Sequence, residues 1–235
     1  MTRTAAMTSL RRFTSLWPDV ALFDLDGTLV DSAPDLAAAI DETLMALDRP
    51  PAGREKVRQW VGNGAGILVR RALTGRVDWE NAEPLDEALF RDASEQFFRF
   101  YERLNGDCST VFEGVEPCLQ RLHDHGCRMA VVTNKPEQFV HPLLERMGLE
   151  HWFEMVIGGD TLPTKKPDAE PLLLPMRKLG GTPGTTVMVG DSDADARAAF
   201  NAGLPAILVR YGYNYGTPVD ELGAEMVVDS LTELL

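Results

Sequence analysis

Two carboxylates, Asp24 and Asp26, stand at the end of the apolar run Val20–Asp24, in the sequence D-L-D-G-T. Residues two apart in an extended segment face the same way, so we expect the two side chains to emerge together. Neighbouring carboxylates repel each other unless a cation relieves them, and Mg²⁺ prefers oxygen ligands. This spacing therefore favours a metal-assisted reaction over an ordinary Asp-Gly turn.

Two further segments of the chain carry a hydroxyl and an ammonium group that could bind an anion. Thr133 and Asn134 come after the apolar run Arg128–Val132, where a helix is expected to begin near Pro136. A hydroxyl and free backbone N–H groups at a helix start can bind an anion, although Thr133 alone could be a plain helix cap. Lys166 precedes a proline and is one of only five lysines, against eighteen arginines. Its ammonium could hold a phosphoryl group, or it could be a solvated surface charge.

The fourth point is Gly190-Asp191-Ser192-Asp193-Ala194-Asp195, which follows the apolar run Thr186–Val189. Asp191 can complete a metal site with Asp24, while Asp193 and Asp195 also suit the first turn of a helix. The four points together supply a carboxylate nucleophile, a hydroxyl, a cation and a metal ligand. Phosphoryl transfer needs these groups and little else, so we interpret the set as a phosphoryl-transfer site.

Short apolar runs rich in β-branched residues alternate with helical patterns, which predicts a parallel sheet with helices on both faces. The expected strands are Val20–Asp24, Arg128–Val132, Met155–Ile157, Thr186–Val189 and Ala206–Val209, with Val227–Val228 at an edge. The expected helices between them are Gly114–His125, Pro136–Met147, Asp168–Leu179 and Asp193–Ala202.

The stretch from Ala33 to Gly106 differs, because it shows no convincing strand. Helical patterns are expected at Ala37–Leu47, Arg54–Val61, Ala65–Leu73 and Leu85–Leu104. An insert at the carboxyl end of a strand lies where open α/β sheets bind ligands. We therefore expect three parts: a flexible extension over residues 1–17, a Rossmann-like core from 18–32 and 107–235, and a helical cap over 33–106.

Composition excludes several classes of function. The net charge of −13 disfavours nucleic acid and anionic lipid as partners. No apolar run approaches the roughly 20 residues of a membrane helix, and the N-terminus has no apolar signal segment. Three cysteines fit neither a zinc pattern nor a disulfide framework, so we expect reduced thiols and a cytoplasmic location.

These motifs resemble the haloacid dehalogenase superfamily, and the resemblance covers nearly the whole chain. It implies that Asp24 is the nucleophile and that Asp26 is the general acid and base. It also implies that Thr133, Asn134 and Lys166 bind the phosphoryl group.

The resemblance further implies a Mg²⁺ cofactor held by Asp24, the backbone carbonyl of Asp26, and Asp191, with Asp195 as a supporting acid. One departure is Ala169, where the family usually has a second proline. No proposed catalytic position is lost.

Several short motifs resemble those of bacterial phosphoglycolate phosphatases within that superfamily. They are Phe23–Ser32 (FDLDGTLVDS), Gly62–Ala65 (GNGA), Val132–Pro136 (VTNKP), Gly158–Asp160 (GGD) and Tyr211–Gly216 (YGYNYG). The resemblance implies hydrolysis of a small phosphate monoester, first 2-phosphoglycolate to glycolate and phosphate, by a monomer or homodimer. Arg70 or Arg71 could bind the substrate carboxylate, although both also suit a solvated helix face.

Three alternatives stay open: a phosphatase of another metabolite or sugar phosphate, a sugar phosphomutase, and a binding protein without turnover. A mutase shares all four motifs and differs in the cap. A non-catalytic relative is expected to lose Asp24 or Asp26, and both are present.

Overall fold

Six parallel strands form the central sheet of the computed structural model, which describes residues 17–235. The strands lie in the order β5-β4-β1-β6-β7-β8, and the sheet confirms the predicted α/β fold class. Their bounds are β1 Val20–Phe23, β4 Arg128–Val132, β5 Met155–Ile157, β6 Thr186–Gly190, β7 Ala206–Val209 and β8 Met226–Val228.

The register of the three central strands brings their carboxyl ends to one level. Phe23 of β1 pairs with Val131 of β4 on one side and with Val189 of β6 on the other. Strand order reverses between β1 and β6, because the chain leaves β1 for β4 and returns to β6. Ligands of open α/β sheets bind at such a switch point, so the residues that follow these strands are well placed for chemistry.

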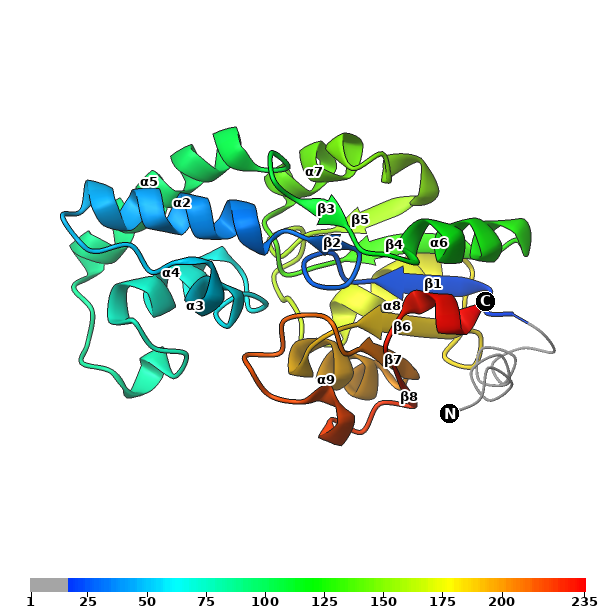
Figure 1. The fold of residues 1–235 in the computed structure, drawn as a ribbon. Helices are drawn as coiled ribbons and strands as arrows, with labels where there is room; N and C mark the ends of the chain where they lie inside the picture. Colours follow the sequence, from blue (N-terminus) through cyan, green and yellow to red (C-terminus); the bar gives the residue numbers. More distant parts are fainter. Residues whose placement is uncertain (1–16) are drawn as a thin grey trace.

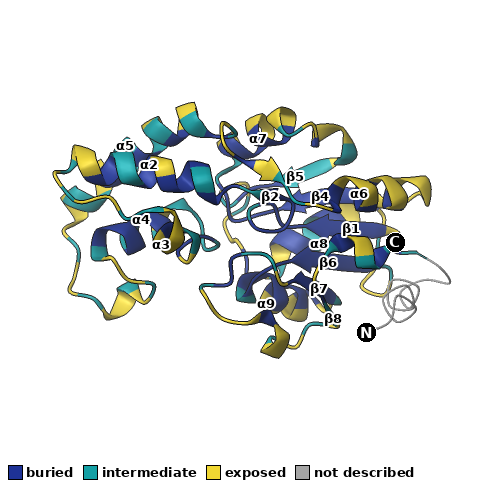
Figure 2. Ribbon diagram, viewed as in Figure 1, coloured by how far each residue is buried: buried dark blue, intermediate teal, exposed yellow. Residues whose placement is uncertain are grey.

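Helices cover both faces of the sheet, as Figure 1 shows. On one face α6 (Val115–Asp124) and α7 (Val140–Arg146) pack against the side chains of Ala21 and Phe23. On the other face α8 (Glu170–Lys178) and α9 (Asp193–Ala202) pack against Val20 and Leu22. All four β1 residues are buried, and Figure 2 shows the central strands β1 and β6 dark blue between the helices. The short 3-10 turns of the core are η2 Glu137–Phe139, η3 Glu150–Trp152, η4 Val219–Glu221 and η5 Leu231–Leu234.

A second apolar core lies mainly in the helical segment after β1, which we call the helical layer (residues 33–106), and it also includes Phe139 and Tyr213. Leu36, Ile40, Val69 and Phe97 are among its buried members. The elements of the layer are α2 Ala33–Ala46, α3 Arg54–Arg58, α4 Ala65–Thr74, η1 Trp79–Asn81 and α5 Glu87–Leu104.

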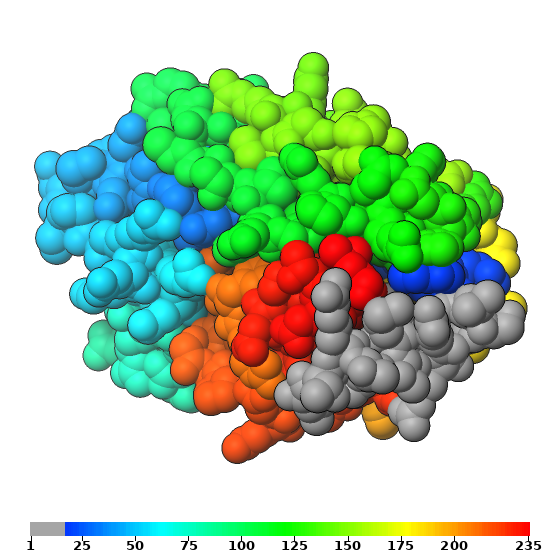
Figure 3. Space-filling view, turned by 45° about the vertical axis from the view of Figure 1, so that its right-hand side comes forward, coloured from blue at the N-terminus to red at the C-terminus, as the bar shows by residue number. Residues whose placement is uncertain are grey.

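A two-stranded antiparallel ribbon connects the helical layer to the sheet, and the sequence did not predict it. Val30–Asp31 (β2) pairs with Thr110–Val111 (β3). Two-residue strands are too short to show alternation, which explains why they escaped the pattern. In the space-filling view of Figure 3, the cyan part of the layer abuts the orange segment after β7, where Arg58 donates a hydrogen bond to the Tyr211 carbonyl at 2.6 Å.

Two predicted helices differ from the observed ones for reasons of proline chemistry. The expected helix Pro136–Met147 is divided into a 3-10 turn, η2, and α7, which begins at Val140. Pro142 has no N–H, so it is best accommodated in the first turn of a helix, where α7 places it. Helix α2 begins at Ala33 instead of Ala37, with a proline in its first turn.

Within residues 17–235, every helix is too short or too polar to cross a membrane. The flexible extension predicted for residues 1–17 lies outside the described residues except for Trp17, whose ring stacks on His125 with centroids 4.1 Å apart.

Candidate active site

Asp24 directly follows β1 and forms an ion pair with Lys166. The Lys166 ammonium lies 2.9 Å from Oδ1 of Asp24 and 2.6 Å from Oδ1 of Asp195, and it donates to the Val132 carbonyl at 2.7 Å. The Asp24 N–H donates to the Val189 carbonyl at 2.9 Å, which fixes the backbone at the end of the strand. Asp195 and Val132 accept hydrogen bonds from the ammonium and Asp24 forms an ion pair with it, so three contacts hold Lys166 beside Asp24.

Asp191 follows β6 and lies on the other side of Asp24. Its carboxylate accepts hydrogen bonds from the Thr28 hydroxyl at 2.9 Å and from the Tyr213 N–H at 2.6 Å. Gly27, with φ +95°, allows this close packing: a Cβ at that position would lie 2.4 Å from Oδ2 of Asp191. The turn after β1 therefore requires glycine both for its backbone conformation and for space.

Asp195 has a double role that reconciles the two interpretations of its sequence motif. Its Oδ2 accepts from the N–H groups of Asp191 and Ser192 and from the Ser192 hydroxyl, which caps the start of α9. Its Oδ1 pairs with Lys166. The helix cap therefore also sets the position of the lysine beside Asp24.

Oxygens of Asp24, Asp191 and Asp195 lie within 4.8 Å of one another, and all three residues are buried. Burial raises the pKa of Asp24 from 3.8 to about 6, although Lys166 opposes this shift. Burial and the neighbouring carboxylates of Asp24 and Asp195 also raise the pKa of Asp191 well above its ordinary value. Three carboxylates face one ammonium here, which is the charge balance expected of a site for a divalent cation.

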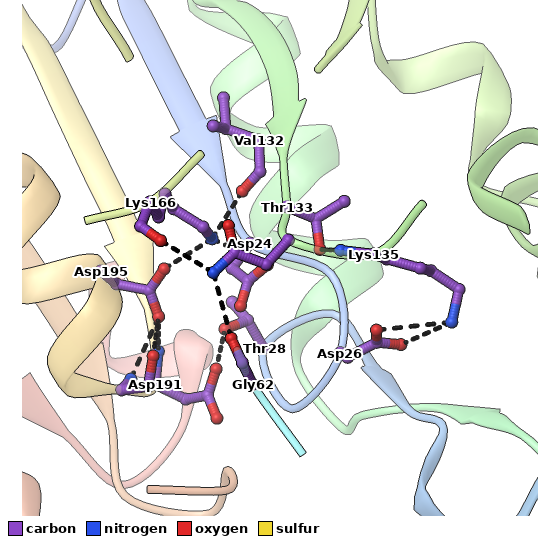
Figure 4. Close-up of polar contacts among 12 residues, drawn as sticks. Asp24, Asp26, Thr28, Gly62, Val132, Thr133, Lys135, Lys166, Asp191 and Asp195 are labelled. Carbon is purple, nitrogen blue, oxygen red and sulfur yellow. Dashed lines mark hydrogen bonds and ion pairs between the residues drawn. The ribbon is translucent and has the colours of Figure 1, made fainter. Parts of the chain in front are cut away.

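Asp26 lies on the opposite side of the site and has a lysine of its own, as Figure 4 shows. Its Oδ1 is 3.1 Å from the Lys135 ammonium and accepts a hydrogen bond of 2.6 Å from the Ser32 hydroxyl. Lys135 also contacts the hydroxyl of Tyr101 from the helical layer. The strand ends at Phe23, so the two-residue alternation does not continue to Asp26, and the carboxylates of Asp24 and Asp26 acquire different partners.

A cavity lies between the sheet and the helical layer. Its sheet side includes Asp24, Asp26, Thr133, Asn134 and Lys135. The helical layer and the segment after β4 add mainly apolar side chains, namely Leu36, Val61, Leu68, Phe97, Tyr101 and Phe139. A few polar side chains at the sheet end of a mostly apolar cavity are typical of a small-molecule site.

Residues 18–203 match the haloacid dehalogenase-like hydrolase family. The chain belongs to this family. Among proteins to which it is similar is a phosphoglycolate phosphatase of Pseudomonas putida, 48% identical over 95% of this chain and 80% of that protein. A phosphoglycolate phosphatase 1 of Pseudomonas aeruginosa is 46% identical over the same shares. The structure of a predicted phosphoglycolate phosphatase from Haemophilus somnus has a TM-score of 0.85 at 36% identity and covers 92% of this chain and 96% of that chain.

Membership in the family and these relatives identify the chain as a phosphoric monoester hydrolase. The structure brings together Asp24, Lys166, Asp191 and Asp195, four of the residues singled out from the sequence of this haloacid dehalogenase-like hydrolase. The side chain of Asp26 faces the same cavity but pairs with Lys135.

Thr133 and Asn134 both line the cavity. The Thr133 hydroxyl accepts from the Lys135 N–H at 3.2 Å. The Asn134 side-chain amide donates to the Lys166 carbonyl at 3.0 Å and to the Gly62 carbonyl at 3.2 Å, so it bridges the hydrolase core and the helical layer. Asn134 therefore also positions the loop before α4.

The two arginines considered for substrate binding have partners within the helical layer. Arg70 lies over the Phe90 ring, 3.8 Å from its centroid, and 3.5 Å from Glu87. Arg71 donates to the Trp60 carbonyl at 2.7 Å and to Oδ1 of Asn63 at 2.8 Å. Neither is among the residues that line the cavity. Arg71 stabilises the Gly62–Gly64 loop, and its guanidinium is not free for a substrate.

The sequence analysis did not assign a role in the site to Lys135 or Thr28. Thr28 belongs to the D-L-D-G-T word, but its hydroxyl reaches Asp191, 163 residues further along the chain. The signal for Lys135 was the scarcity of lysine in this chain and its place directly after Thr133 and Asn134. Sequence spacing does not show that Thr28 contacts Asp191 or that Lys135 contacts Asp26.

Proposed function

We propose that this hydrolase cleaves small phosphate monoesters, first 2-phosphoglycolate, through a phosphoryl group carried on Asp24. The observation that supports it best is the group Asp24, Lys166, Asp191 and Asp195 at the carboxyl ends of the strands. The relatives named phosphoglycolate phosphatase over 95% of this chain support the choice of substrate.

Mg²⁺ is the cofactor that fits this arrangement. Three buried carboxylates whose oxygens lie within 4.8 Å of one another would repel strongly without a cation. We propose that Asp24, Asp191 and the backbone carbonyl of Asp26 hold the ion. Asp195 and Lys166 form an ion pair beside it. When bound, Mg²⁺ neutralises negative charge that develops on the transferring phosphoryl group.

In the first step, a carboxylate oxygen of Asp24 forms a bond to phosphorus and the bond from phosphorus to the ester oxygen breaks. Asp26 in its protonated form donates a proton to the departing alkoxide. Lys166 compensates negative charge beside Asp24, and Thr133 and the backbone after β4 hold the phosphoryl oxygens.

In the second step, Asp26 takes a proton from a water molecule, and the water oxygen attacks phosphorus. The bond to Asp24 breaks and phosphate leaves, which restores the carboxylate of Asp24 and the proton on Asp26. The balance of the two steps is one ester and one water consumed, and one alcohol and one phosphate formed.

We further propose that the helical layer, residues 33–106, is the cap that excludes bulk water during these steps. Tyr101 of α5 and the Gly62 carbonyl before α4 contact the core at Lys135 and Asn134. Closure would therefore bring groups of the cap against the site. We place the enzyme in the cytoplasm, since Cys108, Cys118 and Cys127 are all free.

The test is phosphate release from 2-phosphoglycolate, hexose phosphates and other small esters, with Mg²⁺ and with a chelator. We expect the highest kcat/KM for 2-phosphoglycolate and complete loss with the chelator. Release led by another ester would correct the substrate and keep the mechanism. Conversion of a sugar 1-phosphate to its 6-phosphate without release would favour the mutase, and no reaction at all would favour a binding protein.

A further inference from the structure

The cavity between the sheet and the helical layer contains one cationic side chain among its lining residues, Lys135. Lys166 does not line this cavity. Its ammonium contacts Asp24, Asp195 and the Val132 carbonyl. The two lysines therefore serve different regions: Lys166 the phosphoryl side, and Lys135 the space where the rest of a substrate must lie.

Lys135 is buried, and its ammonium has three hydrogen-bond partners on two residues. They are Oδ1 of Asp26 at 3.1 Å, Oδ2 of Asp26 at 3.4 Å and the Tyr101 hydroxyl. Its Nζ also lies 4.6 Å from the centroid of the Tyr101 ring. The contact to Oδ2 is the longest of the three, so it is the one that a substrate carboxylate can replace. The other walls of the cavity include Leu36, Leu68 and Phe97, where low polarity strengthens a charge–charge contact.

The position of Lys135 beside Asp26 fits one substrate class by its covalent geometry. In a phosphate ester of a 2-hydroxy acid, only two carbon atoms separate the ester oxygen from the carboxylate oxygens. A cation that binds this carboxylate must therefore lie next to the acid that protonates the ester oxygen. Lys135 is in contact with Asp26, the residue proposed for that proton transfer.

Charge supports the same assignment. Of the two carboxylates that line the cavity, Asp24 pairs with Lys166, so Asp26 is the one anionic lining partner of Lys135. A substrate carboxylate adds a second anion beside this ammonium, whereas a neutral alkyl group does not.

We infer that Lys135, assisted by the Tyr101 hydroxyl, is the subsite for a carboxylate on the leaving group and selects phosphate esters of short 2-hydroxy acids. This inference rests on the proposed phosphatase function. It assigns to Lys135 the recognition that the sequence suggested for Arg70 or Arg71.

The experiment compares kcat/KM for 2-phosphoglycolate and for ethyl phosphate, in which a methyl group replaces the carboxylate. We expect the wild type to prefer 2-phosphoglycolate and Lys135→Met to reduce that preference by roughly ten- to a hundredfold, the loss of one hydrogen bond between charged groups. Tyr101→Phe, which keeps the ring, should reduce it by a few-fold. Lys178→Gln is the matched control and should keep the preference, because Lys178 is exposed at the end of α8 and does not line the cavity.

Each outcome separates the inference from the function on which it rests. An equal fall in kcat/KM for both esters in Lys135→Met means that Lys135 acts only through Asp26, and it overturns the subsite. A wild type that hydrolyses both esters equally well also overturns the subsite but keeps the phosphatase. If the wild type releases no phosphate, the function fails; equal affinity of wild type and Lys135→Met for 2-phosphoglycolate by calorimetry then overturns the subsite as well. If Lys135→Met does not fold, Lys135→Gln and Tyr101→Phe give the same comparison.

Discussion

Asp24 and Asp26 are separated by one residue, yet each forms an ion pair with a different buried lysine. Oδ1 of Asp24 lies 2.9 Å from Lys166, and Oδ1 of Asp26 lies 3.1 Å from Lys135. Two carboxylates that shared one environment would share a proton and titrate together. Separate lysines give the two carboxylates different surroundings, and removal of each carboxylate should have different consequences.

Asp24→Asn should abolish turnover, because the amide is a poor nucleophile. We expect kcat to fall by more than about 10⁴-fold. The measurement is phosphate release, together with trapping of acid-stable phosphate on the protein. Asp19→Asn, at the opposite end of β1 and exposed, is the matched control and should keep wild-type turnover. Full activity of Asp24→Asn would refute the mechanism.

The effect of Asp26→Asn on the cleavage rate should depend on the leaving group of the ester. An alkyl ester needs a proton on its departing oxygen, so its cleavage should slow by about 10²–10⁴-fold. p-Nitrophenolate leaves without a proton, so the first step should survive with p-nitrophenyl phosphate while attack by water slows. Stopped-flow absorbance should then show a burst of one nitrophenolate per enzyme molecule. Equal slowing of both esters with no burst would contradict the assignment of Asp26 as the acid.

Lys166→Met should lower stability as well as activity. The substitution leaves Asp24 and Asp195 without their shared cation in a buried site. Loss of one partner from a buried ion pair costs about 3–5 kcal/mol. Chemical denaturation should show this loss, and adding Asp195→Asn should recover part of the stability but no turnover. A Lys166→Met protein as stable as the wild type would contradict the role given to the pair.

The pH dependence of stability follows from the raised pKa of Asp24. Its value in the folded chain, about 6, lies above the ordinary 3.8, so folding favours the protonated form. The stabilising contribution is therefore complete below pH 3.8 and is lost as the pH rises to about 6. With a chelator present, the Tm of the wild type relative to that of Asp24→Asn should fall as the pH rises from 3.8 to about 6.

Mg²⁺ should reverse that trend, because it binds the deprotonated carboxylates. The rise in Tm on adding Mg²⁺ should be small at pH 5 and larger at pH 7.5. Asp24→Asn and Asp191→Asn should each reduce the rise, which thermal unfolding measures directly. A rise in Tm that is independent of pH would place the ion elsewhere.

Much of the fold could be predicted because the strands are short, apolar and bounded by turn residues. The observed β1, β4 and β6 end within one residue of the predicted runs. Since carboxyl ends of neighbouring parallel strands lie at one edge, the order of motifs in the chain was enough to bring Asp24, Thr133 and Asp191 together. That inference required no side-chain detail.

The remaining features depend on contacts that no local pattern encodes. The separation of Asp24 from Asp26 follows from the turn at Gly27 and from lysines more than 100 residues away. The commitment of Arg71 to backbone carbonyls of its own layer depends on how α4 packs. Such partners are fixed by tertiary structure, whereas hydrophobic periodicity reports only which face is buried.

The loop before α4 offers the sharpest test of how the helical layer seats on the core. Gly62 has φ +125°, and a Cβ there would lie 2.8 Å from the Tyr215 hydroxyl of the core. Gly62→Ala should therefore displace the loop whose Gly62 carbonyl accepts from Asn134, and lower kcat/KM by tenfold or more.

Gly53→Ala separates this clash from backbone strain alone. Gly53 also has a positive φ, +82°, but a Cβ there meets nothing within 4 Å. We expect Gly53→Ala to lose about 1 kcal/mol of stability and to keep its kcat/KM. Tyr215→Phe, which removes the nearest atom, should restore part of the activity of Gly62→Ala. Equal losses of kcat/KM in both alanine variants would show that strain, and not contact with Tyr215, governs the loop.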